Sequence, residues 1–310
     1  MKDFCILLLT YNEEQNLPAC LQSMTQLKAP IFAVDSFSTD RTLAILEDHH
    51  IPYLQHPFEH YAAQRNWAQA HIPYETTWVF HLDAGERMTP ELVHWLNEKF
   101  DARSAANGFM FSRRTLFFGK WIKHGGHYPN YHLRLYRASQ GHCENKVYDQ
   151  HFIVKGKKQV IPAGIDIIDT VADSMKHFTV SHARWAQLEA AEIMSNQKVK
   201  GEVQARLFGS PIERRRWLKN NLFQKTPIFL RSFLYFFYRY FFKLGFLDGT
   251  MGLAFHLLQG FWFRFLVDAM VLELRCKQAG GQNSVPLSNQ PLDTYMTKGP
   301  AAPARHSSVK

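Results

Sequence analysis

The sequence predicts an α/β fold in which a mostly parallel, Rossmann-like central sheet is flanked by helices. One observation behind this prediction is the continuous apolar run over residues 4–9, which is typical of a strand buried on both faces. Another is the alternation that follows, because short apolar runs and segments of helical periodicity take turns along the chain. Such alternation is typical of parallel strands joined by right-handed helical crossovers.

The individual elements can be placed in order. A first helix is expected after the first strand, where apolar residues recur at helical spacing: Leu17, Cys20, Leu21, Met24 and Leu27. Further strands are expected at residues 31–34, 53–54, 78–82, 109–112 and 131–136. Further helices are expected directly after residue 41 and at residues 61–71.

Three polar residues stand at the points where predicted strands end. Thr10, Asp35 and Asp83 each close an apolar run of the expected sheet. In open α/β sheets, ligands bind outside the carboxyl ends of the strands. We therefore expect the three side chains to converge on one crevice.

Composition limits the classes of partner. The 310-residue chain carries a formal net charge of +9, which suits nucleic acid, anionic lipid or a phosphorylated substrate without choosing among them. Its four cysteines lie far apart and show no metal-ligand spacing, so neither a zinc site nor a disulfide framework is expected. The short apolar run near the N-terminus is interpreted as a strand, not a signal peptide.

The character of the chain changes after about residue 210. Residues 211–243 contain eight Lys or Arg against one acid, interleaved with eleven aromatic residues. The apolar run at residues 233–238 is shorter than the ~20 residues of a spanning helix, so this pattern favours helices lying in a lipid interface. The uncharged residues 249–263 fit a re-entrant, an interfacial or a buried helix. Nucleic-acid stacking is disfavoured, because the run is more hydrophobic than a solvated platform requires.

Three regions are predicted from these changes. Residues 1–205 form the α/β domain, and residues 206–276 form an aromatic-rich, basic, helical membrane-docking region. Residues 277–310 are rich in Gly, Gln, Ser and Pro and are expected to be a disordered tail.

Four motifs carry a resemblance to a known family. They are Thr10-Tyr-Asn-Glu13, Val34-Asp-Ser-Phe-Ser-Thr-Asp-Arg-Thr42, Gln64-Arg-Asn-Trp67 and Leu82-Asp-Ala-Gly-Glu86. Together, over about residues 4–155, the chain resembles the family-2 inverting glycosyltransferases. More narrowly, it resembles the bacterial subgroup that builds lipopolysaccharide core or exopolysaccharide. The resemblance implies a GT-A fold, a nucleotide-sugar donor and a divalent metal, Mg²⁺ or Mn²⁺.

The motifs supply candidate donor-binding residues: Thr10, Tyr11, Glu13, Asp35, Arg65 and Asp83. The loop at residues 10–13 precedes a helix, where backbone N–H groups can face an anionic nucleotide. Arg65 offers a planar fork to a diphosphate. Relatives often carry two consecutive acids where this chain has Asp35 and Ser36, so the nucleotide base stays open.

The motif expected to bind the metal also lacks one of the two acids that relatives carry. The usual second acid is replaced by Gly85, so we expect Asp83 and Glu86 to share the metal. The alternative is that basic groups, not a metal, stabilise the leaving diphosphate.

An inverting transfer also needs a general base for the acceptor hydroxyl. Val147-Tyr148-Asp149 resembles an element that carries the acid in relatives, so Asp149 is the first candidate and Glu144 the second. Trp121, Tyr128 and Arg134 are candidates for the acceptor side.

The sequence thus predicts a glycosyltransferase that acts with inversion on a lipid-linked, lipopolysaccharide or exopolysaccharide acceptor. We expect a cytoplasmic protein, peripheral on the inner face of the cytoplasmic membrane, with an anionic membrane surface and no nucleic acid as partner. One alternative is an impaired donor-binding scaffold that partners a polysaccharide synthase. Another is a nucleotidyltransferase, although residues 10–16 lack the glycines of a phosphate loop.

Overall fold

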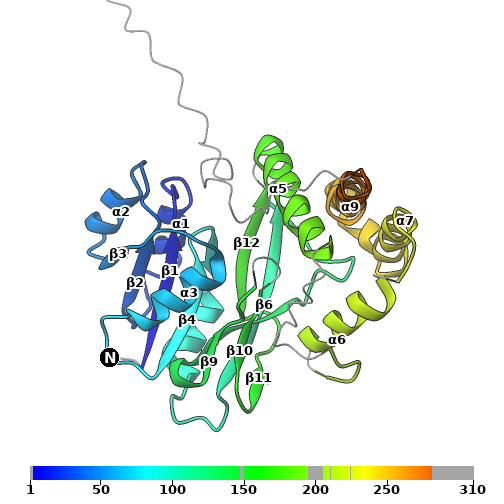
Figure 1. The fold of residues 1–310 in the computed structure, drawn as a ribbon. Coiled ribbons are helices and arrows are strands. Elements are labelled where there is room, and N and C mark those ends of the chain that lie inside the picture. Colours follow the sequence, from blue (N-terminus) through cyan, green and yellow to red (C-terminus); the bar gives the residue numbers. More distant parts are fainter. Residues whose placement is uncertain are drawn as a thin grey trace, which may run out of the picture.

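The computed structural model describes residues 3–146, 150–172, 174–194, 205–209, 211–223 and 225–280. Within this part of the chain, one ten-stranded sheet forms the centre and helices lie on both sides of it (Figure 1). Seven strands run in one direction and three in the other, as the pairing of neighbours requires. The predicted α/β fold with a mostly parallel sheet is confirmed.

The first four strands form a parallel block in the order β3-β2-β1-β4. Their bounds are β1 (Phe4–Thr10), β2 (Ile31–Asp35), β3 (Tyr53–Gln55) and β4 (Trp78–Asp83). The crossovers between them are α1 (Leu17–Gln22), α2 (Thr42–Asp48) and α3 (Tyr61–Ala70). In the register of β1 with its neighbours, Thr10 lies opposite Asp35 and Leu9 opposite Asp83. The polar residues at the strand ends therefore lie side by side, as predicted.

The rest of the sheet is mixed. β8 (Tyr131–Arg137) runs antiparallel between β4 and β6 (Gly108–Phe117), and β12 (Asp166–Ala172) runs parallel to β6. The shorter strands are β5 (Glu86–Met88), β7 (Lys120–Ile122) and β11 (Lys158–Val160), with β9 (Gly141–Cys143) and β10 (Phe152–Val154) forming a separate hairpin. After β5 come α4 (Pro90–His94) and a π-helical turn (Trp95–Lys99), and Ala138–Gln140 make a 3₁₀ turn.

The continuous apolar run of β1 is explained by its central position. Alternate side chains of a strand point to opposite faces. Phe4 and Ile6 pack into the larger hydrophobic core on one face, whereas Cys5 and Leu7 pack into a second core on the other. All four side chains are buried, so the strand needs no polar face.

A helical region follows the sheet. It comprises α5 (Met175–Met194), α6 (Pro211–Leu218), α7 (Leu230–Phe237), α8 (Gly249–Phe255) and α9 (Phe263–Ala279), with shorter turns at Lys219–Phe223, Tyr238–Phe242, Gly245–Asp248 and His256–Trp262. Helix α9 extends past residue 277, where the tail was predicted to begin; residues 281–310 lie outside the described residues. Among the described helices, none combines the length and apolar character needed to span a bilayer.

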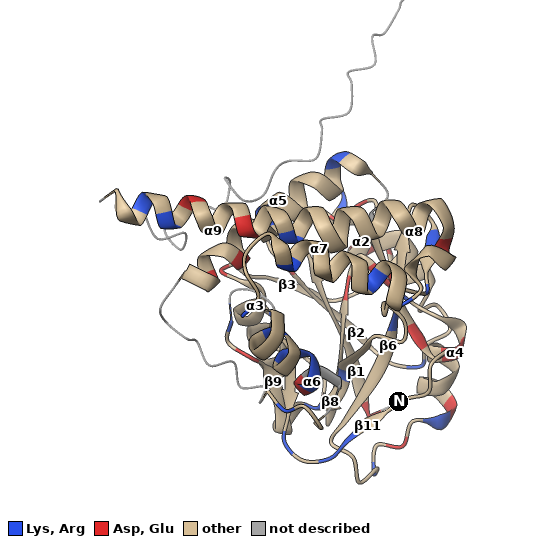
Figure 2. Cartoon of the chain, turned by 90° about the vertical axis from the view of Figure 1, so that its right-hand side faces the viewer, with Lys and Arg blue, Asp and Glu red and all other residues tan. Residues whose placement is uncertain are grey.

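Helix α5 joins this region to the sheet. Ala186 and Ala190 of α5 are buried against Phe263, Val267 and Val271 of α9. An ion pair adds to the packing, because Arg264 of α9 donates to the Glu189 carboxylate at 2.9 and 3.0 Å. Figure 2 shows α8 and α9 following one another along one line with α7 beside them, and several charged residues along α9.

The uncharged residues 249–263 are interrupted and only partly buried. Phe255, His256 and Gly260 are buried within the helical region. Met251, Leu253 and Leu257 on the same stretch are about 40% exposed. The segment therefore packs one side against the protein and leaves apolar side chains on the other.

Candidate active site

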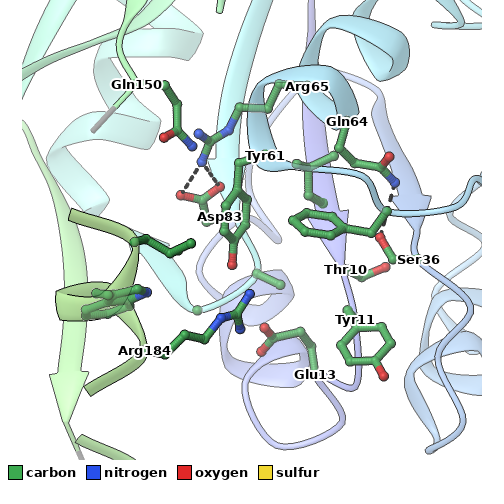
Figure 3. A pocket seen from close by; sticks show the side chains of 16 residues that line it. Thr10, Tyr11, Glu13, Ser36, Tyr61, Gln64, Arg65, Asp83, Gln150 and Arg184 are labelled. Atoms are coloured by element: carbon green, nitrogen blue, oxygen red, sulfur yellow. Dashed lines mark hydrogen bonds and ion pairs between the residues drawn. The ribbon is translucent and has the colours of Figure 1, made fainter. Parts of the chain in front are cut away.

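A cavity of about 430 Å³ lies at the carboxyl ends of β1 and β4 (Figure 3). The ends of β1, β2 and β4 supply Thr10, Tyr11, Glu13, Ser36 and Asp83 to its walls. Helix α3 supplies Tyr61, Gln64 and Arg65, and α5 supplies Arg184, Trp185 and Leu188. Of the six predicted donor-binding residues, all except Asp35 line this pocket.

The charged centre of the pocket is an ion pair between Arg65 and Asp83. The Arg65 Nη2 atom donates to both carboxylate oxygens of Asp83, at 3.0 and 3.2 Å. A second guanidinium, that of Arg134, lies 3.5 Å from Asp83 Oδ2. Burial alone would raise the pKa of Asp83, but Arg65 and Arg134 outweigh it and lower that pKa. Asp83 is therefore a firmly ionised carboxylate at neutral pH.

Arg65 is held in place from several sides. Helix α3 starts at a capped position, because the His60 ring accepts a hydrogen bond from the backbone N–H of Ala63. The Arg65 guanidinium lies over the rings of Tyr61 and Phe152 at 5.4 and 5.3 Å, within range of cation–π attraction. Its Nε atom is buried and has no hydrogen-bond partner among the described residues.

Glu86 does not fit the predicted role of metal ligand. Its side chain is buried and does not line the pocket. Glu86 Oε1 accepts from Arg134 at 2.5 Å, and Oε2 accepts from the backbone N–H of Asp83 at 3.1 Å. A hard cation needs free oxygen ligands, and both oxygens are already engaged. Asp83 itself is neutralised by two guanidinium groups, so the described residues do not form the expected two-carboxylate centre.

The same result holds for other groups of metal-binding side chains. No group of three or more His, Cys, Asp or Glu side chains suited to a metal ion occurs within the described ranges.

Asp35 lies beneath the pocket floor instead of facing the cavity. Its carboxylate is fully buried and accepts from Thr10 Oγ1 at 3.0 Å, from the Ser38 backbone N–H at 2.8 Å and from Gln55 Nε2 at 3.1 Å. The Ser38 hydroxyl also donates to it. The prediction that Asp35 contacts the donor is corrected: Asp35 fixes Thr10, which does line the pocket.

The loop after β1 differs from expectation in one respect. The backbone N–H groups of Asn12 and Glu13 donate to Ser38 Oγ and Thr42 Oγ1, at 2.9 and 2.7 Å. These amides are therefore not available to a nucleotide, and the loop faces the pocket through side chains. Burial raises the pKa of Glu13, and Figure 3 shows its carboxylate and the end of Arg184 pointing toward one another.

Ser36 and Gln64 form a small polar wall. Gln64 is buried, and its Nε2 atom donates to Ser36 Oγ at 3.1 Å and to the His56 carbonyl at 3.2 Å. The Gln64 carbonyl oxygen lies 2.8 Å from His56 Nδ1, so the amide is fully satisfied by the protein. Because the Ser36 oxygen accepts from Gln64, its own proton is left for a partner in the pocket.

Glu144, the second candidate base, is a structural carboxylate. It is fully buried and accepts from Arg216 Nη2 and Nη1 at 2.8 and 3.0 Å and from the His151 backbone N–H at 3.0 Å. Burial opposes ionisation, but hydrogen bonds from His151 and Arg216 prevail and lower the pKa of Glu144 to about 2. A carboxylate so engaged cannot take a proton near neutral pH. Asp149, the first candidate, lies outside the described residues.

The predicted acceptor-side residues are not part of this pocket. Arg134 is buried behind Asp83 and also donates to the His81 carbonyl at 3.3 Å. Trp121 and Tyr128 meet edge to face at 4.9 Å, and the Tyr128 hydroxyl donates to Asp166 at 2.9 Å. Trp121 and Tyr128 therefore lie together on the β6–β8 side of the sheet.

The wall formed by α5 was not predicted. Helical spacing of Phe178, His182, Ala186 and Ala190 signals this helix, since all four are buried. The spacing does not reveal that the opposite side of α5 returns to the carboxyl ends of β1 and β4, although Arg184 lies 101 residues after Asp83 and 174 residues after Thr10.

A mostly parallel sheet with a charged pocket at its strand ends defines an α/β protein whose ligand site lies at the carboxyl edge. The profile of the family described as glycosyl transferase family 2 matches residues 5–154. This match covers 150 of the 310 residues of the chain, and the predicted α/β fold with a mostly parallel sheet is confirmed.

One curated relative is the lipopolysaccharide core biosynthesis glycosyltransferase LpsC of Rhizobium meliloti (strain 1021). It is 30% identical over 135 residues, which cover 42% of this chain and 49% of the relative. The alignment thus spans about half the length of that relative.

Two solved structures are also similar. TarS of S. aureus in complex with UDP-GlcNAc has a TM-score of 0.44 at 14% identity, covering 91% of this chain and 93% of that one. Glucosyl-3-phosphoglycerate synthase from Mycobacterium tuberculosis, in complex with Mn²⁺, UDP and phosphoglyceric acid, has a TM-score of 0.30 at 14% identity, covering 37% and 44%.

Proposed function

We propose that the chain transfers a sugar, with inversion, from a nucleotide-sugar donor to a lipopolysaccharide or exopolysaccharide acceptor. The observation that carries the proposal is the strand-end pocket, which two guanidinium groups, those of Arg65 and Arg184, line beside the carboxylates of Asp83 and Glu13. The relative LpsC supports the acceptor class, because its name assigns it to lipopolysaccharide core biosynthesis.

The proposed reaction is a single displacement at the anomeric carbon. The acceptor oxygen forms a bond to that carbon while the bond from the carbon to the donor phosphate breaks, and the nucleoside diphosphate leaves. A general base takes the acceptor proton as the new bond forms. We assign this role to Asp149, and the support is that Gln150, the next residue in sequence, lines the pocket.

The leaving diphosphate gains negative charge, and preformed cations lower the energy of that charge most where water is excluded. In this chain the cations are the guanidinium groups of Arg65 and Arg184. Asp83 fixes Arg65 by a two-point contact, so the fork is already oriented when the donor arrives.

We further propose that the helical region docks on an anionic membrane at the cytoplasmic face. The support is a set of exposed apolar side chains on neighbouring turns of α7 and the turns that follow it. Their exposed fractions range from 47% to 78%: Phe233, Leu234, Phe237, Tyr238, Phe241, Phe242 and Leu244. Lys243 lies among them and supplies positive charge toward lipid phosphates.

The charge pattern supports this docking less than the sequence suggested. Of the eight basic residues in 211–243, Arg216 forms a buried pair with Glu144, and Arg231 forms one with Asp268. These guanidinium groups point into the protein, so the apolar side chains carry most of the proposed affinity.

A binding and turnover screen tests the proposal. Nucleotide-sugars are added one at a time to the full chain, and binding is read as a rise in melting temperature. We expect one donor class to bind, and Arg65→Gln to lose that binding while the exposed control Arg103→Gln keeps it. Asp149→Asn is expected to bind the donor normally but to lower transfer about 10²–10⁴-fold.

The screen also separates the alternatives. A donor-binding scaffold would bind a nucleotide-sugar but release no nucleoside diphosphate with any acceptor offered. If no nucleotide-sugar binds, or if Asp149→Asn transfers at the normal rate, the proposed chemistry is wrong.

A further inference from the structure

A second group of cationic side chains lies outside the strand-end pocket. It contains Arg113 on β6, Arg215 on α6 and Arg239 in the turn after α7, with His127 between β7 and β8. Asn130 ties two of these elements together: its carbonyl accepts from the Arg113 backbone N–H at 3.0 Å, and its side chain accepts from Arg215. We call these four residues the basic cluster.

The three arginines of the basic cluster all influence the same side chain, the His127 ring. Burial lowers the pKa of His127, and Arg239, His256, Arg113 and Arg215 lower it further, so all these groups lie near the same ring. The rings of His127 and His256 lie 5.6 Å apart. Three guanidinium groups from three separate elements thus act electrostatically on one neutral histidine.

Few acids balance this charge. Arg113 pairs with Asp169 at 3.4 Å and approaches Glu86 at 3.9 Å. Within the described ranges, neither Arg215 nor Arg239 forms an ion pair. A guanidinium group with buried nitrogens and no counter-charge, as in Arg239, is costly unless an anion joins it.

Several donors of the basic cluster also lack a partner. Arg239 Nη1 donates to the Tyr235 hydroxyl at 2.5 Å, but its Nε and Nη2 atoms are buried without any hydrogen bond in the described structure. The same holds for Arg113 Nε and for Nε2 of the neighbouring His132. Buried donors without partners are rare in folded proteins, and here they gather at one place.

We propose that the basic cluster is a second anion site and that it binds a phosphate ester. Planar guanidinium forks match the geometry of phosphate oxygens, and two or more forks favour a doubly charged group. For the identity of its ligand this inference rests on the proposed function: the phosphate belongs to the glycolipid acceptor or to a phospholipid headgroup beside it.

The position of the site fits that ligand. On one side, Arg113 is separated from Asp83 of the donor pocket only by Glu86, which accepts from the Asp83 backbone. On the other side, Arg239 shares its turn with the exposed rings of Phe241 and Phe242. A lipid-linked phosphate held here would lie between the apolar surface and the reacting sugar.

Inorganic phosphate is the probe for a first test on the full chain. It is titrated at constant ionic strength, with chloride as the balancing anion, and binding is read by calorimetry and by melting temperature. We expect saturable binding that weakens about tenfold in Arg239→Gln and in Arg215→Gln. Arg215 is exposed, so its variant keeps the test valid if Arg239→Gln folds poorly.

Two controls fix the location. Arg214→Gln removes an exposed charge from the same helix, and we expect it to leave phosphate affinity unchanged. Arg65→Gln removes a cation of the donor pocket, and we expect the phosphate binding that Arg239→Gln weakens to persist in it. If Arg65→Gln loses phosphate binding and Arg239→Gln keeps it, or if all variants respond alike, the second site is refuted. Because this readout needs no donor, it stands or fails separately from the proposed transfer.

Vesicles then identify the source of the phosphate. Sedimentation with phosphatidylcholine vesicles is compared with and without added phosphatidic acid. A gain from phosphatidic acid that is lost in Arg239→Gln supports the site with a lipid headgroup as ligand. The alternative outcome is that phosphatidic acid increases vesicle binding equally in the wild type and in Arg239→Gln, while the variant binds inorganic phosphate more weakly. That result supports the site with the phosphate of the glycolipid acceptor as its ligand.

Discussion

Arg216 and Glu144 form a two-point ion pair that joins α6 to the loop between β9 and β10, with contacts of 2.8 and 3.0 Å. The carboxylate is fully buried, and the His151 backbone supplies a further hydrogen bond. This pair fastens the helical region to the part of the chain that leads to Gln150 and the pocket.

The pair predicts an acid-sensitive stability. The pKa of Glu144 is lowered from 4.5 to about 2, so its contribution is present above pH 4.5 and is lost as the pH falls toward 2. That difference corresponds to about 3 kcal/mol at neutral pH. We expect Glu144→Gln to lower the free energy of unfolding at pH 7 by about this amount. We also expect the free energy of unfolding of this variant to fall less steeply between pH 4.5 and pH 2.

Denaturant unfolding at a series of pH values measures this. Glu59→Gln is a matched control, because the Glu59 side chain is 79% exposed. A Glu144→Gln protein as stable as the wild type at pH 7 would contradict the assignment.

Ser36 predicts how the donor base is selected. Its oxygen accepts from Gln64, so its proton is directed to a hydrogen-bond acceptor in the pocket. We expect Ser36→Ala to weaken donor binding about two- to tenfold, the worth of one hydrogen bond, with kcat nearly unchanged. Calorimetric donor titration measures the change. Thr39→Ala is the control on the same loop, since the Thr39 side chain does not line the pocket; an equal loss there would deny Ser36 a specific role.

The orientation of Glu86 predicts the outcome of a metal test. Because its two oxygens are engaged by Arg134 and the Asp83 backbone, Glu86→Gln should leave any response of turnover to Mg²⁺ or Mn²⁺ as it is in the wild type. Asp83→Asn should abolish such a response, since Asp83 lines the pocket. Turnover is assayed after chelation and again after each metal is added. A metal response lost in Glu86→Gln alone would restore Glu86 as a ligand.

The apolar surface predicts weakened membrane binding when it is made polar. Phe242 is 78% exposed and Phe237 is 51% exposed. Replacing both with Ser removes apolar area from the interface, and each buried ring contributes roughly 1.5–3 kcal/mol. We expect binding to anionic vesicles, measured by flotation, to fall at least about tenfold. Leu54→Ser on β3 is the control; reduced binding there to the same extent would place the contact elsewhere.

The sequence predicted the N-terminal half of the fold well, for a physical reason. Strands buried on both faces leave continuous apolar runs, and parallel strands place their ends at one edge. Thr10, Asp35 and Asp83 therefore stand at neighbouring strand ends as expected, although only Thr10 and Asp83 line the pocket. The sequence pattern does not show which carboxylate oxygens accept hydrogen bonds from neighbouring side chains. For this reason Asp35 was predicted to bind the donor and Glu86 a metal, although both carboxylates accept hydrogen bonds from within the protein.

The helical region was harder to predict for a related reason. Composition shows that guanidinium groups are present but not which way each one points. Arg216 and Arg231 lie within an aromatic, basic stretch, yet both are directed inward to buried carboxylates. The return of α5 to the pocket depends on long-range packing, which local periodicity does not encode.

Helix α5 has a consequence of its own. One side of it presents Arg184 and Leu188 to the cavity, and the other side holds Ala186 and Ala190 against α9. A shift of α9 against α5 would therefore also move the side of α5 that lines the cavity. If the outer helices dock on a membrane as proposed, α5 is the element through which that contact would reach the cavity wall, and the rate of transfer would then differ between the free and the membrane-bound protein.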